Sequence, residues 1–139
     1  MALLSRETDY AVRALAVLAG AGEGKHVSSS EISRVQRIPL SFLRRILGGL
    51  LRAGLIEARE GRNGGVRLAR KPETISIASV MEIFQGPVSL SRCIFRRRLC
   101  RNGGTCVLRR EIADIESYAA RKLAGLTVAD LLRIQRRKS

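Results

Sequence analysis

The sequence is poor in residue types on which several classes of protein depend. It has no Trp, two Tyr, three Phe and one His in 139 residues. So few rings argue against the aromatic stacking platforms of RNA-binding domains. Nucleophile–base pairs, carboxylate pairs in a suitable context and the Lys-Ser/Thr of a phosphate-binding loop are also missing, so we expect no enzyme. No run approaches 18 uncharged apolar residues, which argues against a membrane span. The opening MALLSRETDY lacks the features of a signal peptide, and we therefore expect a cytoplasmic protein.

Acidic residues are scarce as well. Twelve Asp and Glu face 26 Lys and Arg, for a formal net charge of +14 and a pI near 11.4. Such a field favours polyanions, with nucleic acid first and an acidic membrane surface second, although a basic composition alone is no proof. Most of the positive charge is Arg, which suits bidentate contacts to phosphate and guanine. The charge gathers in residues 25–71 and 92–110. Two separate basic zones indicate two roles.

The first half of the chain reads as three helices followed by a hairpin. Apolar spacing predicts a helix over residues 5–20, and the Ser28–Glu31 capping box begins a second one over 28–35. A third helix, with Pro39 in its first turn, has an apolar stripe and an opposite basic face. The stripe is Leu43, Ile46, Leu47, Leu50 and Leu51, and the opposite face is Ser41, Arg44, Arg45, Gly48 and Arg52. Short strands over 55–59 and 66–70 flank a glycine-rich turn.

This order of elements predicts a winged helix-turn-helix that binds double-stranded DNA, in a mainly α chain with a small β wing. The third helix would enter the major groove, and the hairpin would reach the backbone or the minor groove. We assign base edges to Ser41, Arg44 and Arg45, the wing contact to Arg62 and Asn63, and phosphates to Arg34, Arg37, Arg52 and Arg59.

The second half of the chain is also expected to be mostly helical. A short helix, IASVMEIF, is closed by Gly86-Pro87, and a long one covers residues 107–124. The long helix has a narrow seam of Leu108, Ile112, Ile115, Ala119 and Leu123. Such a seam suits a partner helix, with docking on the chain's own core as the alternative. Thr127 would cap a last short helix, and RIQRRKS reads as a frayed basic tail.

All three cysteines, Cys93, Cys100 and Cys106, fall within 14 residues. An odd count disfavours a disulfide framework. The C-x6-C-x5-C spacing lacks the close pairs of structural zinc sites and resembles three corners of an iron–sulfur site with a fourth ligand elsewhere. Arginines in the same loop would lower the pKa of the thiols. Zinc and a thiol-only redox switch stay open as alternatives. The one histidine, His26, lies far away in the sequence and is a poor candidate for a metal ligand.

The whole chain resembles the Rrf-two family of winged-helix regulators, in its IscR-like and NsrR-like branches. The resemblance rests on LLSRETDYAVRAL, PLSFLRRILGGLLRAGLI and GRNGGVRLARKPETISIASVMEIFQGPV, followed by the cysteine loop. It implies a homodimeric transcriptional regulator on a palindromic operator, with long C-terminal helices crossing at the interface. We divide the chain into a winged helix-turn-helix DNA-binding domain (1–86), a cysteine-rich cluster-binding loop (87–106) and a dimerisation helix with a C-terminal helix and tail (107–139).

The resemblance also implies an iron–sulfur cluster on Cys93, Cys100 and Cys106, and we expect [4Fe–4S] rather than [2Fe–2S]. Arg109 stands where the IscR-like branch has its histidine ligand, so that ligand is missing. Asp9 matches the aspartate that the NsrR-like branch donates from the other subunit. Its alternative role is a helix-start carboxylate favoured by the helix dipole. Glu60 and Val66 depart from the family's wing, and Arg44 replaces an acidic base-reading residue of IscR.

The function predicted from the sequence is therefore a regulator, and more specifically a repressor, that senses redox state, nitric oxide or iron–sulfur status through its cluster. The alternative is a cluster-free regulator of the same fold that switches by cysteine oxidation or by binding a small molecule.

Overall fold

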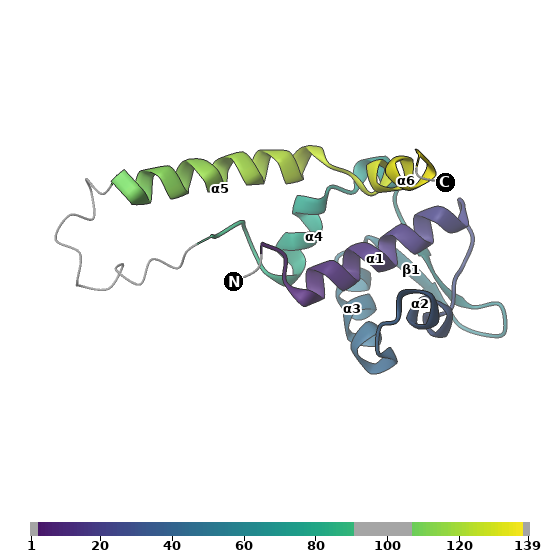
Figure 1. Cartoon of the computed structure of the whole chain (residues 1–139). Helices are drawn as coiled ribbons and strands as arrows, with labels where there is room; N and C mark the ends of the chain where they lie inside the picture. Colours follow the sequence, from purple (N-terminus) through teal and green to yellow (C-terminus); the bar gives the residue numbers. More distant parts are fainter. Residues whose placement is uncertain (1–2, 91–106, 138–139) are drawn as a thin grey trace.

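A computed structural model describes residues 3–90 and 107–137 of the chain, without the side chains of residues 134–136. The helices are α1 (Arg6–Ala21), α2 (Ser29–Gln36), α3 (Leu40–Arg52), α4 (Ile77–Phe84), α5 (Val107–Gly125) and α6 (Val128–Arg137). The strands are β1 (Ile56–Arg59) and β2 (Gly65–Leu68), and a short 3-10 helix, η1, covers Pro72–Thr74. Helices α1 to α4 gather with the strands into one body, and α5 extends from it to one side (Figure 1). The expected mainly helical chain with a small β wing is confirmed.

Serine side chains begin three of the helices. Ser5, Ser28 and Ser76 each accept a hydrogen bond from the backbone N–H three residues later, which satisfies a donor that the helix leaves free. The predicted starts of α1 and α2 are correct to one residue. Pro39 is the N-cap of α3 rather than a residue of its first turn. This difference is small because a cap and a first-turn residue adjoin.

The core lies between α1, α3 and α4. Its residues on α1 and α3 are Ala11, Ala14, Leu15, Leu18, Leu43, Ile46, Leu47 and Leu50, all buried. The predicted apolar stripe of α3 is therefore confirmed for four of its five residues. Leu51 is the exception, because its side chain is 38% exposed. It lies about 100° further round the helix than Leu50, which takes it past the buried edge.

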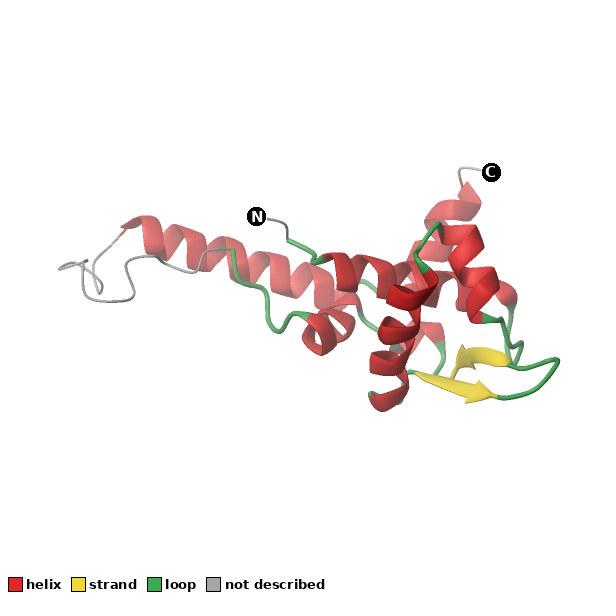
Figure 2. Ribbon diagram, turned by 90° about the horizontal axis from the view of Figure 1, so that it is seen from below, coloured by secondary structure: helices red, strands yellow, loops and turns green. Residues whose placement is uncertain are grey.

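The wing is a two-stranded antiparallel sheet in which Ile56 pairs with Leu68 and Arg59 with Gly65. Both strands are shorter than predicted. Val27 pairs with Val66 through two backbone hydrogen bonds of 2.9 Å, so the loop before α2 runs beside β2. Figure 2 shows the two strands of the hairpin in yellow. Gly65 has φ 147°, and a Cβ there would collide with the Val27 carbonyl. This close approach explains why the turn ends in glycine.

Helix α6 returns to the body and lies against α1 (Figure 1). Its start is tied to the start of α4, because Ile77 N–H donates to Leu126 O and Val128 N–H to Ile75 O. Val128 and Ala129 are buried. The prediction of a frayed tail is wrong for residues 133–137, which are helical. Packing of the first turns supports the rest of a helix that would be marginal alone.

Helix α5 has a different environment. It is 19 residues long, about 28 Å, and none of its residues is buried. Leu108 and Ile115 are 68% and 54% exposed, whereas Leu123 packs on the edge of the core. Docking on the chain's own core therefore explains only the C-terminal end of the seam. In the described ranges, neither α5 nor any other helix is long and apolar enough to cross a membrane.

Candidate functional site

The outward side of α3 is a stripe of polar and basic residues. We call it the basic face of α3, and it consists of Ser41, Arg44, Arg45, Gly48 and Arg52. Its four side chains other than glycine are exposed. The spacing of three, four and seven residues places them on one side of the helix, opposite the buried leucines. The predicted base-edge residues and Arg52 therefore lie together on an accessible helix.

The two glycines of α3 have different roles. A Cβ at Gly49 would stand 2.9 Å from the Phe84 ring, so this glycine permits α3 and α4 to pack closely. A Cβ at Gly48 would meet only the Arg52 guanidinium, at 3.4 Å. Gly48 therefore leaves the basic face without a side chain at this position, and it is not needed for the packing of a neighbouring helix.

The turn between α2 and α3 holds the basic face at a fixed angle to the body. Arg37 is the C-cap of α2 in the left-handed conformation, with φ 54° and ψ 44°. Its N–H donates to Ser33 O, and the Ser33 hydroxyl donates to Ile38 O at 2.6 Å. Ile38 is buried. The side chain of Arg37 is exposed beside α3, as is Arg34 on α2.

The wing presents Arg62 and Asn63 at its exposed turn. The guanidinium of Arg59 braces the turn, because its Nη2 donates to the backbone oxygen of Asn63 at 2.9 Å. A guanidinium has five N–H donors, so this bond is compatible with a phosphate contact as well. Arg67 is paired across the strands with Glu57, at 3.0 Å. Partial desolvation, followed by the charges of Arg59 and Arg67, lowers the pKa of nearby His26, against an opposing effect of Glu57. The wing base is therefore a positive environment.

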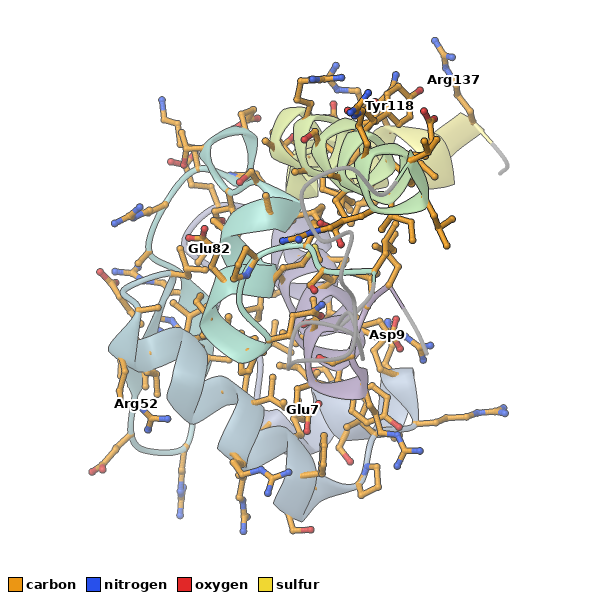
Figure 3. All side chains as sticks on the ribbon, turned by 90° about the vertical axis from the view of Figure 1, so that its left-hand side faces the viewer. Glu7, Asp9, Arg52, Glu82, Tyr118 and Arg137 are labelled. Atoms are coloured by element: carbon orange, nitrogen blue, oxygen red, sulfur yellow. The ribbon has the colours of Figure 1, made fainter. Side chains whose placement is uncertain are left out.

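Asp9 lies on the exposed side of α1, where its carboxylate pairs with Arg13 one turn later at 2.9 Å. The side chains of Asp9 and Arg13 are 43% and 47% exposed. Figure 3 shows Asp9 farther round α1 than Glu7, which faces the α3 side. The carboxylate is thus accessible to an incoming ligand or partner.

A polar network that the sequence analysis missed fixes the start of α1 to the end of α4. The side-chain oxygen Oε1 of Gln85 accepts hydrogen bonds from Ser5 N–H at 2.8 Å and from the Thr8 hydroxyl at 2.7 Å. The side-chain nitrogen Nε2 of Gln85 donates to Leu3 O at 3.0 Å. Thr8 is fully buried. Nothing in local periodicity signals this network, because its members are about 80 positions apart.

Cys93, Cys100 and Cys106 lie outside the described residues. The segment before them is anchored, because Leu90 N–H donates to the Glu116 carboxylate on α5 at 2.9 Å. Among residues 3–90 and 107–137, no three His, Cys, Asp or Glu side chains gather as a metal site. Iron–sulfur clusters are held mainly by Cys thiolates, so three cysteines would supply three of four ligands and leave one position for another side chain.

Comparison with known proteins identifies the family. The sequence model of the Rrf2 family, described as iron-dependent transcriptional regulator, matches residues 4–134. The chain belongs to the Rrf2 family. This member has the fold of CymR, the global cysteine regulator of B. subtilis, with a TM-score of 0.78 at 21% identity over 94% of this chain and 96% of that one. The comparison with IscR of T. potens gives a TM-score of 0.77 at 23% identity, over 95% of this chain and 87% of that one. The comparison with the oxidized form of Staphylococcus aureus CymR gives a TM-score of 0.76 at 19% identity, over 94% of this chain and 95% of that one.

This Rrf2 chain is accordingly a winged-helix DNA-binding transcriptional regulator. The resemblance drawn from its sequence motifs is confirmed, and so is the winged-helix fold. The ligand set and the assignment of individual DNA contacts stay predictions.

Proposed function

We propose that this protein is a homodimeric repressor that reads a palindromic operator and responds to redox state, nitric oxide or iron–sulfur status. The observation that carries the DNA-reading part is the basic face of α3, which is exposed along its length beside a positively charged wing. The formal charge of +14 supports the same partner.

The exposed side chains divide into two roles. Ser41, Arg44 and Arg45 occupy the first half of α3, the part of a recognition helix that contacts base edges. Arg34, Arg37, Arg52 and Arg59 would hold phosphates, and Arg62 and Asn63 would make the wing contact. Phosphate contacts set the register, and base contacts set the sequence that is bound.

The seam of α5 supports the homodimer. Its residues, Leu108, Ile112, Ile115, Ala119 and Leu123, recur at helical spacing on a helix with no buried residue, and Leu108 and Ile115 are exposed. A second copy of α5 would cover this apolar surface and place two α3 helices on successive major grooves, about 34 Å apart. Such a pair reads an operator with two-fold symmetry.

The ligands that we propose for the cluster are Cys93, Cys100 and Cys106 of one subunit and Asp9 of the other, with [4Fe–4S] expected rather than [2Fe–2S]. When bound, the cluster would supply a centre that is sensitive to oxidants and nitric oxide. The two residues next to Asp9 in the sequence contact other elements. The Thr8 hydroxyl donates a hydrogen bond to the side chain of Gln85 at the end of α4, and the Tyr10 ring contacts the Phe42 ring of α3. A change in how Asp9 is held therefore reaches α3 through α1, and a coupling of about 1–3 kcal/mol suffices for a switch.

The first test is the iron and sulfide content of protein purified without oxygen, with a visible spectrum. We expect about four irons per chain with labile sulfide, lost in Cys100→Ser. About two irons would contradict the [4Fe–4S] assignment and weaken that of Asp9. Colourless protein that still binds DNA in a salt-dependent manner would overturn the cluster and leave the DNA-binding role intact.

Asp9→Ala tests the link between sensing and reading. We expect operator binding by the untreated protein to stay nearly unchanged, while its response to nitric oxide or oxidant changes. Arg13→Ala removes the ion-pair partner of Asp9 but no proposed ligand, so it measures the effect of losing the ion pair alone. An unchanged response in Asp9→Ala would contradict the tether.

A second candidate is a cluster-free regulator that switches by cysteine oxidation. The likeness to the oxidized form of Staphylococcus aureus CymR supports it. It predicts colourless protein whose operator affinity changes with peroxide and recovers with a thiol reductant. Replacing all three cysteines by Ser would abolish that response.

A further inference from the structure

Arg45 is held on an aromatic ring at the edge of the basic face of α3. Its guanidinium carbon lies 4.6 Å from the centroid of the Phe42 ring, one helical turn earlier. Phe42 in turn meets Tyr10 of α1 edge to face, with 5.4 Å between ring centroids and 89° between the planes. Tyr10 and Phe42 are both partly buried against the core. Two packed rings therefore fix the surface on which Arg45 rests.

We infer that Phe42 is a positioning residue for DNA reading, which holds the Arg45 guanidinium in place to donate to a base edge. The inference rests on the proposed base-reading role of Arg45. Its chemical basis is that a guanidinium stacks through its face, while all five N–H donors lie in its plane. A guanidinium that lies face-on over the Phe42 ring keeps free the edge that makes a bidentate bond to guanine.

An unstacked Arg45 would have a competing partner. Arg45, Arg52 and Glu7 all line one hollow of about 420 Å³ between α1, α3 and α4. Figure 3 shows Glu7 and Arg52 on this side of the molecule. Arginine has several rotatable bonds, and a carboxylate in the same hollow would attract a guanidinium that leaves the ring. The Phe42 ring therefore opposes both rotamer freedom and a turn toward Glu7.

Arg44 is an internal comparison. It lies on the same helix turn and is exposed, yet in the described part of the chain no ring lies beneath it, and the only arginine stacked on Phe42 is Arg45. A general weakening of α3 would affect both arginines alike. A positioning role affects Arg45 alone.

The test is a pair of double-mutant cycles on DNA affinity. The probe is a labelled duplex that the wild-type protein has selected from a randomised library, measured by fluorescence anisotropy at one salt concentration. Phe42→Leu should weaken binding about two- to fivefold, the range expected for a lost cation–π contact at an exposed site. Phe42→Tyr keeps a ring and should restore the affinity. In an Arg45→Ala background Phe42→Leu should have no further effect, and in an Arg44→Ala background it should keep its full effect.

Repeating the selection with Phe42→Leu supplies a readout that a purely structural role would not move. We expect the preference to relax at the base pair that Arg45→Ala also relaxes, with the other positions unchanged. If Phe42→Leu unfolds at the assay temperature, Phe42→Met takes its place, since Met keeps the volume and apolar character without a ring.

The outcomes separate the two claims. If Arg45→Ala binds the selected duplex as tightly as wild type, the proposed reading role of Arg45 is wrong. If Arg45→Ala weakens binding but Phe42→Leu acts equally with and without Arg45, the positioning role is overturned while the reading role stands. The positioning role would also be overturned if Phe42→Leu lowered the DNA affinity by the same factor in the Arg44→Ala and the Arg45→Ala backgrounds.

Discussion

Arg37 shows how one residue serves both the geometry of the fold and its charge. It is the only non-glycine residue with a positive φ in the described ranges. A side chain with a Cβ costs about 1–2 kcal/mol in this conformation, and glycine avoids most of that cost. The residue nevertheless carries a guanidinium at the helix-turn-helix corner, where we propose a phosphate contact. Stability and DNA binding therefore have opposite demands at this position.

Replacing Arg37 by Gly should separate those demands. We expect the free energy of unfolding to rise by about 0.5–1 kcal/mol in urea titrations, because the left-handed strain is relieved. Operator affinity should fall, and the salt dependence of log K should lose about one unit per subunit. Arg37→Lys is the control, since it keeps the charge and the strained backbone. A glycine variant with unchanged affinity would contradict the phosphate contact.

At the scale of the element, α6 depends on a reciprocal cap. Thr127 N–H donates to the Asp130 carboxylate at 3.0 Å, and the Thr127 hydroxyl donates to it at 3.1 Å. Asp130 N–H donates back to the Thr127 hydroxyl at 3.3 Å. The backbone bond from Thr127, then its hydroxyl bond, and more weakly Arg133 lower the pKa of Asp130, against a partial desolvation that raises it.

This cap should make part of the stability pH-dependent. The carboxyl of Asp130 has a lower pKa in the folded chain than its ordinary value of about 4 in the unfolded chain. Its contribution is therefore present above about pH 4 and is lost as pH falls through the folded value. Asp130→Asn should lower stability at pH 7 and reduce the loss between pH 7 and 3 in urea unfolding. Asp114→Asn, on the exposed side of α5, is the control, and an acid loss as large as that of wild type in Asp130→Asn would contradict this assignment.

At the scale of the whole molecule, α5 carries apolar side chains that the rest of the described chain does not cover. Val107, Leu108, Ile115 and Tyr118 are all more than half exposed, and Figure 3 shows Tyr118 on the outer side of the helix. Leu90 holds the segment that leads to the cysteines against Glu116 of the same helix. The proposed dimer seam and the approach to the cysteines therefore share α5.

Ile115→Glu should break the proposed dimer, because it would bury a carboxylate in an apolar seam. We expect sedimentation equilibrium to show a monomer at concentrations where wild type is a dimer. Affinity for the full palindrome should fall more than about tenfold, while that for a half-site changes little. Ser117→Glu adds the same charge on an exposed position away from the seam. A variant that stays dimeric would place the interface elsewhere.

Local pattern was enough to predict most elements. Apolar spacing and the Ser28 cap located α1, α2 and α3, and IASVMEIF matches α4 residue for residue. The basic face of α3 followed from the same periodicity, since residues opposite a buried stripe face solvent. The family motifs added the class of protein. These features depend on neighbours within one or two turns, which the sequence displays directly.

The tertiary structure alone decided which chemically similar groups have partners. Among the wing arginines, Arg59 braces a turn and Arg67 pairs with Glu57, and Arg45 but not Arg44 rests on a ring. Gln85 reaches Thr8 across 77 positions, and the tail of α6 is helical because its first turns are buried against α1. Such contacts depend on where distant segments meet, which no local period encodes. The sequence by itself determined the helices, the wing and the positive charge, and packing determined which side chains stay free to use that charge.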